Sequence, residues 1–198
     1  MTNLSFNAST PLAHMVISKG VSETGLSAMQ QALLVIGGSI LLAISAHIKV
    51  PFYPVPVTMQ TMFVLLIGMA YGSRLGLATV LAYLAQGAAG LPVFAGGAGL
   101  AYMVGPTGGY LAGFALAAFA VGLMAEKGWG KSMLTTAAAM IVGNIIIYAL
   151  GVTWLSNIIG SFDKAIQFGL APFIYGDLLK IVIATALLPT AWKMLSKR

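Results

Sequence analysis

Six apolar stretches, separated by short polar or glycine- and proline-rich breaks, dominate the sequence. A helix that crosses the hydrocarbon core of a bilayer needs about 20 mostly apolar residues. The pattern therefore predicts six membrane-spanning helices, of which the second is short. They run from Ala28 to Ile48, Thr58 to Tyr71, Leu75 to Gly90, Gly108 to Ala125, Ser132 to Leu155 and Pro172 to Met194.

The composition agrees with a membrane protein. Of the 198 residues, 59% are hydrophobic and 7% are charged, and the mean hydropathy is +0.96. A soluble domain carries about 25% charged residues, so a water-facing surface of the usual kind is excluded. The chain has no cysteine and two histidines, which excludes disulfides and argues against a metal site. We expect an all-α integral membrane protein.

The basic residues predict its orientation, because Lys and Arg are enriched in cytoplasmic loops. With six spans both termini lie on one side, and a cytoplasmic placement puts most basic residues inside. Residues 1–27 would form a cytoplasmic segment and residues 28–198 a single six-helix domain. The charges are too scattered for nucleic-acid binding. The inside residues are Lys19, Arg74, Lys127, Lys131, Lys193, Lys197 and Arg198; Lys49 and Lys164 fall outside.

The outside loops are longer than the inside loops and rich in Pro, Gly and aromatic residues. They span residues 49–57, 91–107 and 157–171. Irregular apolar backbone near a membrane persists only where protein or a cavity buries it. We therefore expect a ligand cavity at the outer ends of the helices.

Two charged residues, Asp177 and Lys180, lie within the sixth span. Their i, i+3 spacing places them on one helix face. Charges inside a membrane are costly and face the bundle interior or a wet cavity. They form either a structural ion pair or a ligand site, in which Lys180 meets an anion and Asp177 accepts hydrogen bonds from ligand N–H groups.

Several other side chains are candidates for the same cavity. Gln86 and Asn144 lie inside spans and either bond a neighbouring helix or contact a ligand amide. Gln60 follows Thr58, which is a candidate helix cap. Trp154 belongs either to an interfacial aromatic belt or to the cavity wall.

The glycine-rich stretch 90–100 lacks the strand, helix and lysine of a phosphate-binding loop. Its glycines favour a loop folded tightly over a ligand. The stretch Gly130-Lys131-Ser132 mimics the end of a nucleotide-binding motif without its required first glycine, so any ATP hydrolysis would belong to another subunit.

Small residues line parts of the first span. Ser39 with Ala43, and Ala28 with Ala32, are spaced four residues apart. Such pairs give a smooth helix face. It serves either internal packing or the docking of another membrane subunit.

Four motifs together resemble BioY, the biotin-specific S component of energy-coupling factor (ECF) transporters. The resemblance spans about Gln30 to Lys193. It implies an ECF S-component-like bundle that binds biotin at the outer face of a prokaryotic plasma membrane. The motifs are residues 55–61 (VPVTMQT), 90–97 (GLPVFAGG), 105–110 (GPTGGY) and 176–180 (GDLLK).

The resemblance also implies partners: a transmembrane coupling protein and two ATPases, with biotin as cargo and no cofactor. The alternative is a proton-coupled secondary transporter of a small anion, with Asp177 as proton carrier. An enzyme is disfavoured because no nucleophile–base pair is evident. The predicted docking residues are Ser39, Ala43, Ala28 and Ala32. The predicted substrate-binding residues are Asp177, Lys180, Gln86, Asn144, Gln60, Phe94, Gly96, Gly97, Tyr175 and Trp154.

Overall fold

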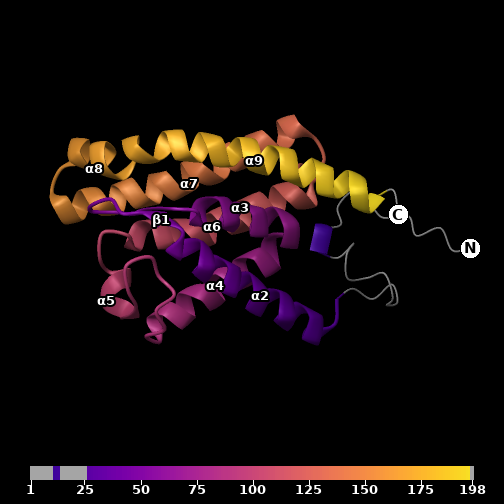
Figure 1. Ribbon diagram of the computed structural model, residues 1–198, viewed down its shortest axis with the longest axis horizontal. Helices are drawn as coiled ribbons and strands as arrows, with labels where there is room; N and C mark the ends of the chain where they lie inside the picture. The colour runs from indigo at the N-terminus through magenta and orange to yellow at the C-terminus, as the bar shows by residue number, and fades with distance from the viewer. Residues whose placement is uncertain (1–10, 14–25, 197–198) are drawn as a thin grey trace, which may run out of the picture.

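The computed structural model describes residues 11–13 and 26–196. Figure 1 shows an elongated helical bundle with one short antiparallel ribbon. The elements are α2 (Ala28–His47), β1 (Lys49–Val50), β2 (Val57–Thr58), α3 (Gln60–Tyr71), α4 (Ser73–Ala88), α5 (Gly99–Met103), α6 (Gly108–Glu126), α7 (Met133–Ile159), α8 (Phe162–Gly169) and α9 (Ala171–Ser196).

A helix occupies each of the six predicted positions, with its ends shifted by a few residues. Within the described residues, four helices are long and apolar enough to cross a membrane: α2, α6, α7 and α9. Helices α3 and α4 have 12 and 16 residues, which at 1.5 Å per residue fall short of a bilayer core about 30 Å thick. The chain therefore has several apolar helices of spanning length, and the count of six crossings stays a prediction.

Helix α6 is the centre of the bundle. It packs along α7 and against α3 and α4. Of an apolar 18-residue stretch of this helix, 61% is buried inside the protein. Glycines make these contacts close. A Cβ on Gly113 would lie 2.9 Å from the Cα of Ile147, and one on Gly122 would lie 2.4 Å from the backbone nitrogen of Ser73. Small residues let helix backbones approach in this way in membrane proteins.

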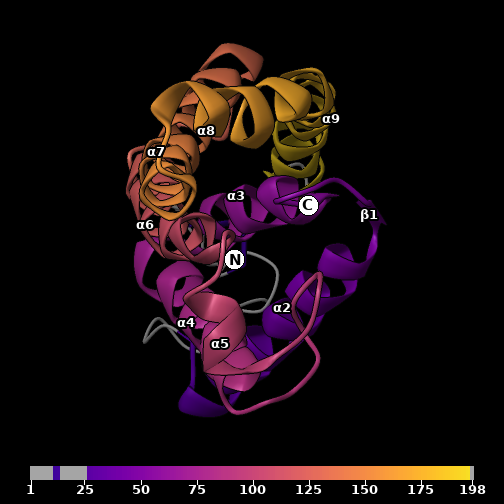
Figure 2. The same cartoon turned by 90° about the vertical axis from the view of Figure 1, so that its left-hand side faces the viewer.

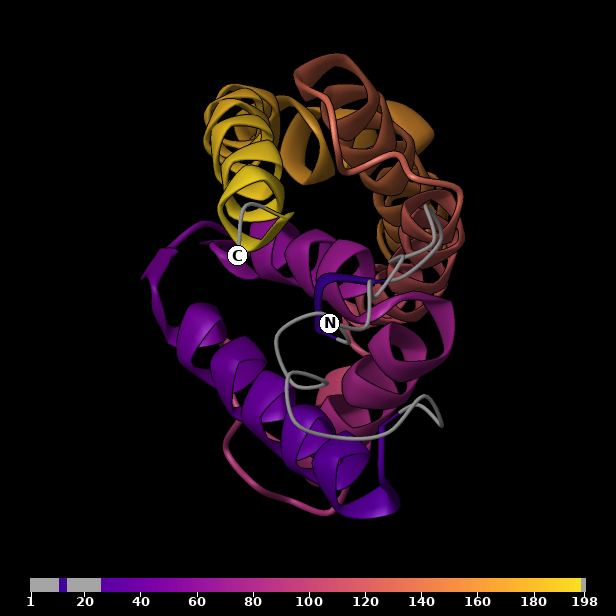
Figure 3. The ribbon, with the colours of Figure 1, turned by 90° about the vertical axis from the view of Figure 1, so that its right-hand side faces the viewer.

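Helices α3 and α6 separate two flanking groups, α2 and α4 on one side and α7, α8 and α9 on the other (Figure 2). The view from the opposite end shows α2 and α9 at the periphery (Figure 3). The exposed row on α2 is apolar, as expected of a lipid-facing surface. It consists of Met29, Leu33, Ile36, Ile40 and Ile44.

The two ends of the bundle differ. The start of α2 and the end of α9 lie at one end, and α5, α8 and the β-ribbon lie at the other (Figure 1). In the ribbon, Lys49 pairs with Thr58 and Val50 with Val57. This pairing folds the segment between α2 and α3 back over the bundle, where it contributes to a cavity.

Candidate ligand-binding site

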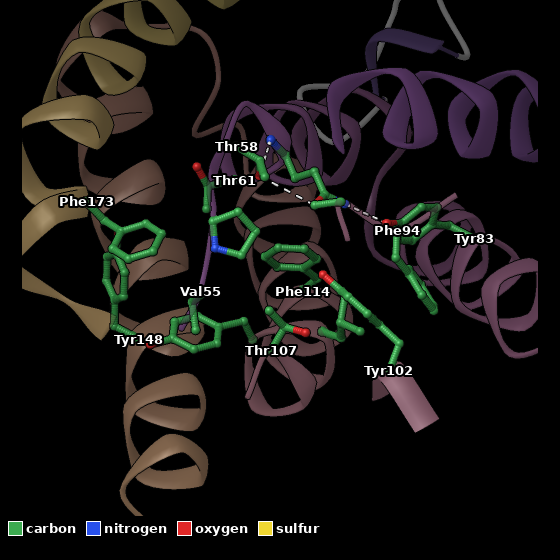
Figure 4. Close-up of a pocket in the computed structure, with 15 residues that line it drawn as sticks. Val55, Thr58, Thr61, Tyr83, Phe94, Tyr102, Thr107, Phe114, Tyr148 and Phe173 are labelled. Atoms are coloured by element: carbon green, nitrogen blue, oxygen red, sulfur yellow. Dashed lines mark hydrogen bonds between the residues drawn. The ribbon is translucent and has the colours of Figure 1, made fainter. Parts of the chain in front are cut away.

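A partly open cavity, with about 480 Å³ of empty space including its mouth, lies at the end of the bundle that carries the β-ribbon. Its wall is largely aromatic and aliphatic, with a few hydroxyl and amide groups (Figure 4). The lining residues are Val55, Pro56, Thr58, Gln60, Thr61, Tyr83, Phe94, Ala95, Tyr102, Thr107, Tyr110, Leu111, Phe114, Tyr148 and Phe173.

Aromatic side chains form two opposite walls of this cavity (Figure 4). On one wall Phe94 meets Tyr83 edge to face at 5.5 Å between ring centroids and stacks on Tyr102 at 5.1 Å. On the other wall Tyr148 meets Phe173 edge to face at 6.2 Å. Aromatic pairs in these geometries are favourable beyond their buried area. The walls therefore form two packed units with an apolar space between them.

The glycine-rich loop places Phe94 in its wall. A Cβ on Gly87 would lie 2.0 Å from the Phe94 ring, so the ring rests directly on the backbone of α4. Phe94 and Gly97 form an isolated antiparallel bridge. Gly97 and Gly99 have φ values of 151° and 84°, which only glycine adopts at low cost. The loop thus turns tightly and directs Phe94 into the cavity wall.

Buried charges lie behind the polar part of the wall. Asp177 and Lys180, both on α9, are 3% and 7% exposed and form an ion pair at 2.6 Å. Lys180 Nζ also donates to the carbonyl of Thr58 at 2.7 Å and to the hydroxyl of Thr61 at 3.0 Å. A lysine ammonium has three donors, so all three of its N–H groups are used.

Asp177 is almost as fully bonded. Its Oδ1 accepts from Lys180 at 2.6 Å and from Thr61 at 2.9 Å, and its Oδ2 accepts from the hydroxyl of Tyr148. A carboxylate offers about four acceptor positions, which leaves one on Oδ2. Thr61 and Tyr148 line the cavity whereas Asp177 and Lys180 do not. The ion pair therefore locks α3, α7 and α9 together and also lies directly behind the cavity wall.

Gln60 lies on the cavity itself. Its Nε2 donates to the hydroxyl of Tyr83 at 2.7 Å, and its Oε1 accepts from Thr58 at 3.4 Å. The Thr58 hydroxyl also accepts from the Gln60 backbone N–H at 3.2 Å. Thr58 is not the helix cap, however, because the N-cap position of α3 is Met59, which makes no side-chain capping bond. Among the hydrogen bonds of the described residues, the second Nε2–H of Gln60 has no acceptor.

Two predicted amide residues lie away from the cavity lining. Gln86 donates to Ser39 at 2.9 Å and so bonds α4 to α2. Asn144 donates to the carbonyl of Met140 in its own helix at 3.0 Å. Its buried Oδ1 has no partner in the described part of the chain. Both side chains therefore bond within the helical bundle and do not line the cavity.

The remaining candidates lie near or outside the cavity. Trp154 donates to the carbonyl of Gly105 at 2.9 Å and holds that loop against α7. Tyr175 is 83% exposed on α9. Gly96 lines an adjacent hollow of about 600 Å³ that shares Tyr102 with the cavity. Gly97 lies beside the same tyrosine.

Several lining residues were absent from the sequence prediction. Thr61 is the last residue of the motif at 55–61. Its position directly after the candidate Gln60 is the sequence feature that could have indicated it. Tyr83, Tyr102, Phe114 and Phe173 gave no such signal, because an aromatic residue in an apolar helix faces lipid, core or cavity with the same local pattern.

Comparison with known proteins finds a matching family and several similar proteins. A model described as the BioY family matches residues 15–197. The chain is similar to the biotin transporter BioY of Thermotoga maritima, with 46% identity over 147 residues, covering 73% of this chain and 85% of that protein. It is 41% identical over 145 residues to the probable biotin transporter BioY of Pyrococcus horikoshii, with coverage of 73% and 85%.

A solved structure has the same fold. It is the crystal structure of the S-component for biotin from an ECF-type ABC transporter. The TM-score is 0.73 at 26% sequence identity, and the match covers 85% of this chain and 95% of that one.

Proposed function

Because this chain belongs to the BioY family, we propose that it is the biotin-binding membrane subunit of an energy-coupling factor transporter. It captures biotin in the cavity and delivers it across the membrane. The family consists of transport proteins and not of enzymes, and biotin is the transported ligand, so no cofactor is required.

The cavity is the observation that supports this function. Biotin combines an apolar bicyclic thioether ring and an aliphatic chain with two polar ends, a ureido group and a carboxylate. Apolar pockets with a few placed polar groups bind such molecules. The aromatic walls suit the ring and the aliphatic chain of biotin. Gln60, Thr61 and Tyr148 place polar protein groups on the same cavity.

We assign the ureido group to Gln60 and Asp177. A ureido group has one C=O acceptor and two N–H donors. Gln60, which lines the cavity, has one unused amide N–H for the C=O. Asp177 has one unused acceptor position for an N–H but lies behind the cavity wall. In this proposal the side chains of Thr61 and Tyr148 shift on binding, so that a ligand N–H reaches Asp177. Lys180, Thr61 and Tyr148 then hold the Asp177 carboxylate in position.

All six apolar helices cross the membrane in this proposal, with both termini cytoplasmic. Helices α3 and α4 are too short to span the core alone and cross it as part of the bundle, packed against α6. The distribution of Lys and Arg supports that orientation. The end with the β-ribbon, α5 and α8 then faces outward (Figure 1), so the cavity opens toward the external solution. The membrane is the prokaryotic plasma membrane.

The proposed partners are a transmembrane coupling protein and two ATPases. Ala28 and Ala32 are exposed on α2, whereas Ser39 is fully buried and bonded to Gln86. Of the two small-residue pairs, Ala28 with Ala32 is therefore the one available to a docking helix. Ala43 is half-buried and lies near Ser39 on the inward face.

Uptake of radiolabelled biotin by cells that express the chain tests this function. We expect uptake to require the ATPase module and to survive dissipation of the proton gradient at unchanged cellular ATP. Uptake that needs the proton gradient and persists without the module would instead support a proton-coupled secondary transporter.

A further inference from the structure

The carboxylate of bound biotin needs a cation, and Lys180 is poorly placed to supply it. Its three N–H groups are all bonded within the protein, and Asp177 already neutralises its charge. Removing one partner from a buried ion pair is strongly unfavourable. A second anion beside Asp177 would also place two carboxylates together, which is unfavourable.

Another cation lies at the edge of the cavity. Lys49, at the start of β1, donates from Nζ to the carbonyl of Ala95. Ala95 lines the cavity, and so does Thr58, the cross-strand partner of Lys49. Only this one of the three ammonium donors of Lys49 bonds a described residue.

The charge of Lys49 has no compensating carboxylate within residues 11–13 and 26–196. The acidic residues described there are Glu126, Asp163 and Asp177, and the ion pair found among them joins Asp177 to Lys180. Glu126 caps α4 through Ser73 at the opposite end of the bundle. Lys49 is also an exposed residue, so pairing it with an anion has a smaller desolvation cost than rearranging a buried pair.

We propose that Lys49, and not Lys180, binds the carboxylate of biotin at the edge of the cavity. This inference rests on the proposed function and adds the orientation of the ligand. The ureido ring lies against Gln60 and Asp177, and the aliphatic chain runs past the aromatic walls toward the β-ribbon. The Ala95 carbonyl holds the ammonium in place through one donor while the other two meet the carboxylate.

Binding of two ligands to purified protein tests the proposal. Biotinol has the ring and chain of biotin but a neutral alcohol in place of the carboxylate. We expect the wild type to bind biotin about tenfold or more tightly than biotinol, since charge-assisted hydrogen bonds are the stronger kind. Lys49→Met should lose this preference by weakening biotin binding alone. Lys49→Arg should keep most of it.

Lys164→Met is the matched control, because Lys164 is exposed on α8 at the same end of the bundle and does not line the cavity. It should leave both affinities unchanged. An equal loss for both ligands in Lys49→Met would show that Lys49 only holds the loop, and a retained preference would exclude it; either overturns the proposal. A folded wild type that binds neither ligand would overturn the proposed function as well.

Discussion

A single ammonium group organises the polar side of the cavity at the scale of residues. Lys180 bonds the Thr58 carbonyl, the Thr61 hydroxyl and the Asp177 carboxylate. These groups come from the segment leading into α3, from α3 and from α9. Such a buried cluster is stable only when every member is bonded. The i, i+3 spacing of Asp177 and Lys180 predicted the pair, but no local pattern indicated the partners on α3 and α7.

Removing one donor from this cluster should loosen it. We expect Tyr148→Phe to destabilise the protein by about 1–2 kcal/mol, because Asp177 loses a hydrogen bond that joins α7 to α9. The affinity for biotin should fall as well, since the Asp177 carboxylate that receives the ligand N–H is less firmly positioned. Thermal unfolding in detergent and a binding titration measure the two effects. An unchanged melting temperature together with an unchanged affinity would refute the assigned contact.

Two glutamines separate ligand contact from helix packing. Gln60 lines the cavity, whereas Gln86 bonds Ser39 between α4 and α2. We expect Gln60→Leu to weaken biotin binding by about tenfold, because the ligand C=O loses its donor. Gln86→Leu should leave the affinity unchanged. Equal affinities of the two variants for biotin would remove Gln60 from the site.

At the scale of elements, glycine determines how closely the helices pack. Hydropathy predicted the positions of the six apolar helices well, because a helix in a membrane is apolar on both its lipid-facing and its buried side. It did not predict their contacts, since lipid-facing and buried residues are equally apolar. For the same reason the sequence did not single out Tyr83 and Phe173, which line the cavity, whereas its charge predicted that Asp177 is turned into the bundle. Tyr175, two residues before Asp177, instead lies exposed on α9.

The α6–α7 contact makes a testable case. We expect Gly113→Ala to destabilise the protein by about 1–3 kcal/mol, because the new Cβ would meet the backbone of Ile147 at 2.9 Å. Gly37→Ala is the control, as its Cβ would have no neighbour within 4 Å and alanine favours a helix. Thermal unfolding in detergent compares them, and a Gly113→Ala variant as stable as Gly37→Ala would contradict this packing.

At the scale of the whole molecule, function depends on which end faces outward. The chain has no cysteine, so a single introduced thiol reports its own side of the membrane. Lys164 on α8 and Lys127 after α6 are both exposed, at opposite ends of the bundle. In intact cells an impermeant maleimide should label Lys164→Cys and should label Lys127→Cys only after permeabilisation. The reverse pattern would place the cavity on the cytoplasmic side.

The measurement that tests the central claim most directly is equilibrium binding of radiolabelled biotin to the purified chain. The account predicts saturable binding of about one biotin per chain, since the aromatic cavity beside the β-ribbon has polar groups for one ureido ring. It predicts weaker binding for Gln60→Leu. A folded, monodisperse protein that binds no biotin, or binds it equally well after Gln60→Leu and Asp177→Asn, would contradict it.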